Sequence, residues 1–137
     1  MSRTESDVIG DVLIEDTSYY GINTHRAKEN FQITGQTADS DHINSIVTIK
    51  RSAAVANKMG GKLPQEKADA ILKACDRILK GELHDQFVVD VFQAGAGTSY
   101  NMNANEVIAN LALEVDCMLT HTTIIRVSSE AAKAGTR

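Results

Sequence analysis

Aromatic residues are scarce in this sequence, which has no tryptophan, three tyrosines and three phenylalanines among its 137 residues. A buried core must therefore be built from isoleucine, leucine, valine, alanine and methionine. The chain has one proline, Pro64, and this argues against a linker-rich or low-complexity protein. Its length suits one domain, because a chain of this size buries roughly 70% of its unfolded surface.

What is missing also disfavours several classes of protein. A formal net charge of −4 argues against a nucleic-acid surface. No stretch approaches the ~20 apolar residues that span a bilayer, and the polar N-terminus lacks the apolar segment of a signal peptide. Cys75 and Cys117 stand far apart in apolar patterns, so we expect buried thiols rather than a disulfide. Together these features predict a cytoplasmic protein that binds neither nucleic acid nor a membrane.

The first part of the chain is predicted to form an irregular arm. Helical periodicity is absent over residues 8–35, where short extended pieces broken by glycine are consistent with one small hairpin. Within this arm, residues 24–31 are predicted to form a helical turn with Thr24 as its cap. The arm therefore contributes short strands to a fold that is otherwise helical.

The rest of the pattern predicts a mainly α-helical fold. One helix is expected over about residues 41–59, with Ser40 or Asp41 as its cap, and a second over about 65–80. The short connection between them predicts antiparallel packing. A third helix is expected to begin near Asn101.

The most informative stretch runs from Gln93 to Glu106 and reads QAGAGTSYNMNANE. Two glycines and two alanines leave its backbone bare, and the hydroxyls of Thr98 and Ser99 follow. The first N–H groups of a helix have no intrahelical partner and carry partial positive charge, so a helix start of this kind binds anions. We therefore predict that the main-chain amides of residues 95–101 bind a phosphate or a carboxylate.

Neither of two common phosphate-binding motifs describes this loop. No Gly-Lys-Ser/Thr follows the glycines, which excludes a Walker A loop. Gly95 and Gly97 give G-x-G, but the third glycine of a dinucleotide fingerprint and its βαβ context are absent. The alternative is an ordinary tight turn before a helix capped by Thr98 or Ser99. Local chemistry leaves both interpretations open.

Three asparagines follow the loop, at positions 101, 103 and 105. Asparagine is unfavourable inside helices because its side chain competes for backbone hydrogen bonds. Asn101 and Asn105 share a helix face and could form a polar wall beside the loop. Asn103 points elsewhere and is expected to join the helix start to neighbouring loops. The same structural role stays open for the other two.

No metal site and no cofactor are predicted. The four histidines show neither metal-ligand spacing nor an H-E-x-x-H motif. Asp85 and Asp90 flank an apolar run and are expected to cap or pair locally. Arg26 could place a cation near the anion site, although solvent-exposed charge is the commoner outcome for such a residue.

Several rare strings, in order, resemble the aspartase/fumarase superfamily. The match to its first signature region is carried by DQFVVDVFQ at 85–93, GAGTS at 95–99 and NMNANEVIAN at 101–110. The arm over 19–31 and the string AAVANK at 53–58 fit the same family in the same order. Together they cover roughly residues 6–114, nearly the whole chain.

The resemblance implies a lyase that removes the C3 proton of L-aspartate and expels ammonia to leave fumarate. It implies a homotetramer with no cofactor, in which Thr98 donates to a substrate carboxylate and Gly97 and Ser99 shape the pocket. Asn101 is the fourth predicted substrate-binding residue. Ala96, where class II fumarases usually carry serine, together with the Tyr-Tyr-Gly string at 19–21, favours an aspartate ammonia-lyase, with a fumarase-type lyase as the alternative.

The chain also departs from the superfamily pattern. Two further signature regions, including the flexible loop with the catalytic base, do not occur in it. We therefore assign no catalytic residue and expect the chain alone to be inactive. The expected organisation is an aspartase-like domain over 1–114 and a divergent tail over 115–137, with strand-like residues 119–127 and helix-like residues 128–133. Two other hypotheses are a non-catalytic fragment acting in binding or assembly, and a phosphate-binding module.

Overall fold

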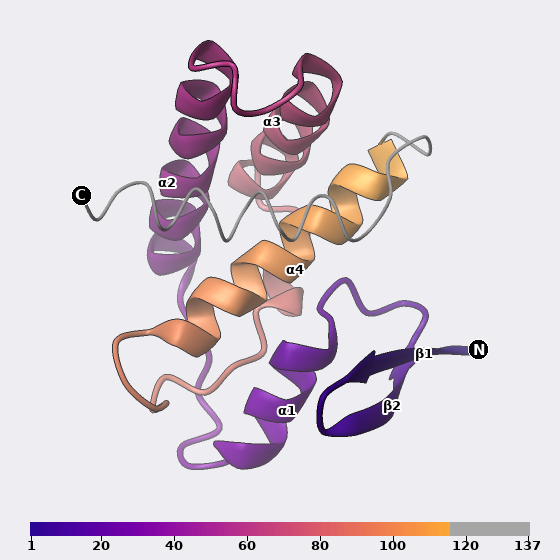
Figure 1. Ribbon diagram of the computed structural model, residues 1–137. Helices are drawn as coiled ribbons and strands as arrows, with labels where there is room; N and C mark the ends of the chain where they lie inside the picture. The colour runs from indigo at the N-terminus through magenta and orange to yellow at the C-terminus, as the bar shows by residue number, and fades with distance from the viewer. Residues whose placement is uncertain (116–137) are drawn as a thin grey trace.

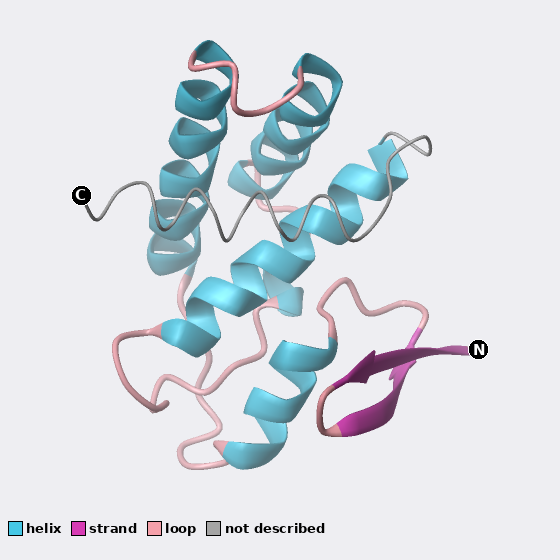
Figure 2. Cartoon of the chain, in the orientation of Figure 1, coloured by secondary structure: helices cyan, strands magenta, loops and turns pink. Residues whose placement is uncertain are grey.

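The computed structural model describes residues 1–115. Its elements, in chain order, are β1 (Ser2–Asp7), β2 (Gly10–Glu15), α1 (Ile22–Asn30), α2 (Ser40–Met59), α3 (Gln65–Leu79), the 3₁₀ turn η1 (His84–Gln86) and α4 (Thr98–Val115). Helices dominate, and the two strands belong to the N-terminal arm (Figure 2). The predicted mainly helical fold is confirmed. The expectations for Cys117 and for residues 119–127 and 128–133 lie outside the described residues.

The N-terminal arm begins with an antiparallel hairpin. Its register runs from Ser2 opposite Glu15 to Asp7 opposite Gly10, which leaves a two-residue turn. In this turn Asp7 Oδ1 accepts hydrogen bonds from the N–H groups of Ile9, at 2.8 Å, and Gly10, at 3.2 Å. The φ of +133° at Gly10 is a conformation that side chains disfavour, so glycine suits the start of β2.

Helices α2 and α3 form the predicted antiparallel pair and lie side by side (Figure 1). The cap of α2 is Asp39, whose Oδ1 accepts from the His42 N–H at 2.8 Å. The prediction of Ser40 or Asp41 as cap is wrong, because the helix starts one residue earlier and the Asp39 carboxylate reaches its first turn. Pro64 immediately precedes α3, as expected for a residue that has no N–H to leave unpaired.

Helix α4 lies between the α2–α3 pair and the N-terminal arm, and it contacts α1, α2 and α3 (Figure 1). The buried core consists of Ile43, Val47, Ala54, Leu63, Ala68, Ala70, Ile71, Ala74, Cys75, Ile78, Phe87, Ala104, Val107, Ile108, Ala109, Leu111 and Ala112. It is almost wholly aliphatic, as the scarcity of aromatic residues predicts. Burial raises the pKa of the Cys75 thiol to about 12, which confirms this cysteine as a buried thiol.

Helix α1 is capped by a carboxylate from α4. Glu106 is 2% exposed, and its Oε2 accepts from the N–H groups of Gly21, at 2.9 Å, and Thr24, at 3.1 Å. Its Oε1 accepts from the N–H and the side-chain amide of Asn23, at 3.0 and 2.9 Å. The Thr24 hydroxyl donates to Oε2 at 2.5 Å. This one side chain therefore pairs three of the four orphan N–H groups at the start of α1, and the fourth, that of Ile22, donates to Glu5 Oε2 at 2.8 Å.

The prediction that Thr24 caps the helical turn is therefore wrong. The helix begins at Ile22, with Gly21 in the cap position and Thr24 inside the first turn. A Cβ built on Gly21 would lie 2.9 Å from Glu5 Oε2 and 3.0 Å from Glu106 Cδ, so a larger residue here would have to displace these two carboxylates. In the described part of the chain, no helix is both long and apolar enough to cross a membrane.

Candidate anion-binding site

The loop before α4 adopts a backbone that requires glycine. Gly95 and Gly97 have φ values of +67° and +79°, in the left-handed region that side chains disfavour. A Cβ built on either residue meets no atom within 4 Å. The two glycines therefore serve the backbone conformation, and the space beside them is open to a ligand.

Helix α4 begins at Thr98, three residues earlier than predicted, so Thr98, Ser99 and Asn101 all lie in its first turns. The Asn101 N–H donates to the Gly97 carbonyl at 3.0 Å, and the Tyr100 N–H donates to Gln93 Oε1 at 2.9 Å. Two of the amides predicted to bind an anion are thus engaged internally. The remaining candidates are the amides at 95–99 and the two hydroxyls.

Neither hydroxyl of the pair caps α4. The side chains of Thr98 and Ser99 hydrogen-bond to no group within residues 1–115, and Thr98 is exposed. The alternative interpretation of a helix capped by Thr98 or Ser99 is therefore wrong, because Gln93 reaches over the loop and supplies the side-chain acceptor. Both hydroxyls are left available as donors to a bound anion.

Asn101 is joined to a buried lysine that sequence analysis did not single out. Lys50, on α2, is 8% exposed, and its Nζ donates to Asn101 Oδ1. Burial lowers the pKa of Lys50. A signal existed in the sequence, because the spacing of Ile43, Val47, Lys50 and Ala54 places the lysine on the apolar face of its helix. The residues at the start of α4 therefore have a positive charge beside them.

Asn103 and Asn105, the other two of the three asparagines that follow the loop, are fully buried. Asn103 accepts from the Val88 N–H at 3.0 Å and donates to the Gln86 carbonyl at 3.0 Å, so it joins the helix to the preceding segment. This confirms its predicted structural role. Asn105 donates to Met102 Sδ at 3.7 Å, and its Oδ1 has no partner in the described part of the chain.

Asp90 fixes the segment that leads into the loop. It is 5% exposed and accepts from the N–H groups of Thr34, Gly35 and Phe92, at 2.7, 2.8 and 2.8 Å. Burial would raise the pKa of Asp90, but the hydrogen bonds from these three N–H groups outweigh it and hold the pKa well below the usual range. The expectation that Asp90 caps or pairs locally holds only for Phe92, because Thr34 and Gly35 lie 56 and 55 residues away in sequence; we call this set of hydrogen bonds the Asp90 clamp. Asp85 pairs locally as expected, since its Oδ2 accepts from the side-chain amide of Gln86 at 2.9 Å.

Two further observations concern residues that could contribute to the loop. Val91 and Phe92, between Asp90 and the loop, are 39% and 62% exposed, and nothing in residues 1–115 covers them. Arg26 is not at the loop, because Asp7 of the hairpin binds it at 2.7 and 2.8 Å. The cation beside α4 is Lys50 instead.

The surroundings of the loop are open in this part of the protein. A hollow of about 700 Å³ lies at the other end of α4, where Arg3, Tyr19 and Glu114 are among its lining residues. Within residues 1–115, no group of three or more histidine, cysteine, aspartate or glutamate side chains is placed to hold a metal ion. A ligand at the loop would therefore rest on an open surface made of amides, hydroxyls and one buried ammonium.

Comparison with known proteins identifies the family. A family model described as "Lyase" matches residues 10–129. The aspartate ammonia-lyase of Bacillus subtilis is 51% identical over 113 residues, which is 82% of this chain and 24% of that protein. The class II fumarate hydratase of Helicobacter pylori is 47% identical over 113 residues, with the same coverage of 82% and 24%. The chain thus spans about a quarter of the length of these curated relatives.

A solved structure agrees with this assignment. The native form of the fumarate lyase:delta crystallin from Brucella melitensis superposes with a TM-score of 0.83 at 43% identity, over 96% of this chain and 31% of that one. The boundary at residue 114 stays a prediction, since the family match continues to residue 129. The chain belongs to the lyases of the aspartase/fumarase superfamily and corresponds to their N-terminal region.

Proposed function

We propose that this chain is the N-terminal part of an aspartase-type ammonia-lyase, which converts L-aspartate into fumarate and ammonia. In this proposal the chain contributes a carboxylate-binding loop made of Gly97, Thr98, Ser99 and Asn101. The single observation that supports it most is the open start of α4, where two unpaired hydroxyls follow the left-handed Gly97 beside a buried ammonium. The similarity to aspartate ammonia-lyases supports the reaction type.

The chemistry explains why such a loop is useful. The C3 proton of aspartate is weakly acidic, and its removal places additional negative charge on the neighbouring carboxylate. Donors that are already aimed at this carboxylate stabilise the charge without reorganising, which is the largest contribution in many enzymes. Main-chain amides at a helix start and the Thr98 hydroxyl are donors of this kind. The residue that takes the proton is not assigned to this chain.

A class II fumarase is the alternative, because relatives of both types are close to half identical to this chain. Both reactions handle a four-carbon dicarboxylate, so the loop fits either substrate. Two reciprocal chimeras distinguish them, in which residues 10–114 of this chain replace the matching segment of the Bacillus subtilis aspartate ammonia-lyase or of the Helicobacter pylori class II fumarate hydratase. We expect the first to keep its formation of fumarate from L-aspartate better than the second keeps its formation of fumarate from L-malate, and the reverse order would favour the fumarase type.

The chain alone is proposed to be inactive and to depend on other segments or subunits of a homotetramer. Exposed apolar side chains support this, since Ile33 is 63% and Phe92 62% exposed close to the Asp90 clamp. We expect the purified chain to form no fumarate from L-aspartate, as followed by ultraviolet absorbance, and to self-associate in sedimentation. Measurable turnover, or a clean monomer at all concentrations, would contradict this part of the proposal.

Ligand binding by the loop can be tested directly on the chain. The ¹⁵N-labelled protein is titrated with succinate, L-aspartate and inorganic phosphate while the amide signals of the loop are followed. Succinate should shift the signals of Gly97, Thr98 and Ser99, and Thr98→Val should weaken its binding. Thr48→Val, at an exposed position on α2, is the matched control. A response to phosphate alone would favour a phosphate-binding module and overturn the dicarboxylate assignment.

A further inference from the structure

Lys50 is a charged residue in a place that normally holds an apolar one. It lies on α2 and shares the buried face of that helix with Ile43, Val47 and Ala54. Its side chain nevertheless ends at the start of α4, where Nζ donates to Asn101 Oδ1. The lysine stem is therefore packed in the core while its ammonium is delivered to the first turns of α4.

The ammonium lacks the partner that a buried charge requires. No carboxylate oxygen within residues 1–115 lies within 4.0 Å of Lys50 Nζ, and its hydrogen-bond partner there is a neutral amide. Burying an ion without a counter-ion is costly, so such charges are normally paired or bind a ligand. The start of α4 adds partial positive charge at the same place instead of compensating for it. Both features favour the arrival of an anion.

A second polar group lies one turn further along α4. Asn105 shares a helix face with Asn101 and is fully buried, and its Oδ1 has no partner in the described residues. The same stripe of α4 thus holds one amide oxygen that is bound by Lys50 and one that is not. This arrangement is unusual for a packed helix and is expected where polar groups are held ready for a ligand.

We propose that Lys50 is a positioning residue that supplies the fixed positive charge of the carboxylate site and orients Asn101 toward it. This inference rests on the proposed function, since it assigns the anion at Gly97–Asn101 as the counter-ion of the lysine. Lys50 does not act on the reacting atoms. It sets the preference of the loop for a charged carboxylate over a neutral group of the same shape.

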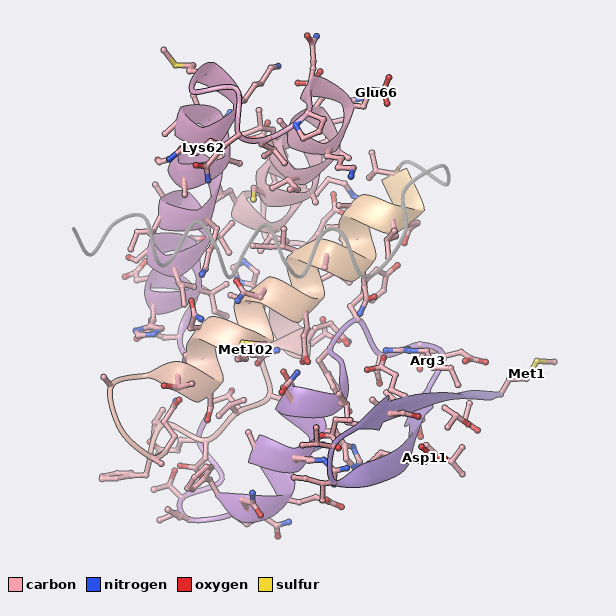
Figure 3. All side chains as sticks on the ribbon, in the orientation of Figure 1. Met1, Arg3, Asp11, Lys62, Glu66 and Met102 are labelled. Carbon is pink, nitrogen blue, oxygen red and sulfur yellow. The ribbon has the colours of Figure 1, made fainter. Side chains whose placement is uncertain are left out.

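The test compares two lysine substitutions in the full chain. Lys50→Met removes the buried charge and keeps the apolar stem, whereas Lys62→Met removes an equal charge from the exposed connection after α2, far from Met102 at the start of α4 (Figure 3). Each variant is titrated with succinate and with its neutral analogue succinamide. Lys50→Met should bind succinate at least about tenfold more weakly than the unmodified chain, since one unit charge a few ångströms away changes a binding constant roughly fivefold at the dielectric of water and roughly a thousandfold at that of a partly buried site. Lys62→Met should bind it normally.

A measurement on the unmodified chain protects the test against a variant that fails to fold. Succinate should shift the ¹³Cε signal of Lys50 and leave that of Lys62 unchanged, and succinamide should shift neither. If succinate binds but neither the Lys50 signal nor the Lys50→Met affinity changes, the inference is overturned while the proposed function stands. If the unmodified chain binds no dicarboxylate, the proposed function fails and the inference fails with it.

Discussion

Glu106→Gln should remove much of the free energy that holds α1 against α4. The substitution keeps the shape of the side chain but turns one carboxylate oxygen into an NH₂ donor. If the NH₂ takes the place of Oε1, both donors of Asn23 lose their acceptor. If it takes the place of Oε2, the N–H groups of Gly21 and Thr24 lose theirs. Either orientation leaves at least two donors facing a donor, but those of Asn23 belong to an exposed residue that water can reach, whereas those of Gly21 and Thr24 are buried.

The expected loss follows from the cost of such unpaired groups. A buried donor without an acceptor costs about 1–3 kcal/mol, so two of them cost roughly 2–6 kcal/mol. Because the glutamine takes the orientation that costs less, with its NH₂ toward exposed Asn23, we expect the free energy of unfolding to fall by about 2 kcal/mol. Since domains are stable by about 5–15 kcal/mol, this is a large fraction of the total.

Urea unfolding followed by far-ultraviolet circular dichroism measures this loss. The midpoint should fall while the slope with urea stays constant, as for a change in stability alone. Glu66→Gln, at an exposed position in the first turn of α3, is the matched control (Figure 3) and should cost less than about 1 kcal/mol. A Glu106→Gln variant no less stable than this control would refute the idea that one carboxylate caps α1.

Three further predictions concern other buried groups. Gly21→Ala should cost about 1–3 kcal/mol in the same urea assay, because its Cβ would lie 3.0 Å from Glu106 Cδ, and an unchanged midpoint would contradict this. The pKa of Asp90 is lowered on folding from its ordinary value of 3.8, so its carboxylate stabilises the fold above that pH and the stabilisation is lost as the pH falls through the folded pKa. Asp90→Asn should therefore flatten the loss of stability in acid, and urea midpoints at a series of acidic pH values check this. In a Cys117→Ser background, Cys75 should resist alkylation by iodoacetamide in the folded protein and react in urea, because burial raises its pKa to about 12.

The helices that could be predicted are those whose signals are local. Pro64 before α3 and the glycines after α2 mark boundaries that depend on a few neighbouring residues, and the structure confirms both helices there. The start of α1 could not be predicted in this way. Its cap is Glu106, which is 82 residues from Thr24 in sequence, and no local pattern announces so distant an acceptor.

In the candidate site, too, some features could be predicted from the local sequence and others depend on how distant segments pack. The glycine-rich loop and its two hydroxyls could be recognised because their spacing alone describes a bare helix start. The part played by Gln93 depends on a side chain that folds back over the loop, and the part played by Lys50 depends on how α2 and α4 cross. A lysine on an apolar helix face is visible in the sequence, but its destination is a property of the packing.

Three residues in a short stretch of helix α4 form hydrogen bonds to three different neighbouring segments. Asn101 accepts a hydrogen bond from α2 and Asn103 accepts one from the segment before the loop. Glu106 accepts hydrogen bonds from the start of α1. Successive residues of a helix are rotated by about 100° around its axis. Inserting or deleting a single residue between Asn101 and Glu106 would thus rotate some of these side chains away from their hydrogen-bond partners. The connection between α2 and α3 could change in length without this effect. Evolution can exchange side chains along this stretch of α4, but it cannot easily change the number of residues in it.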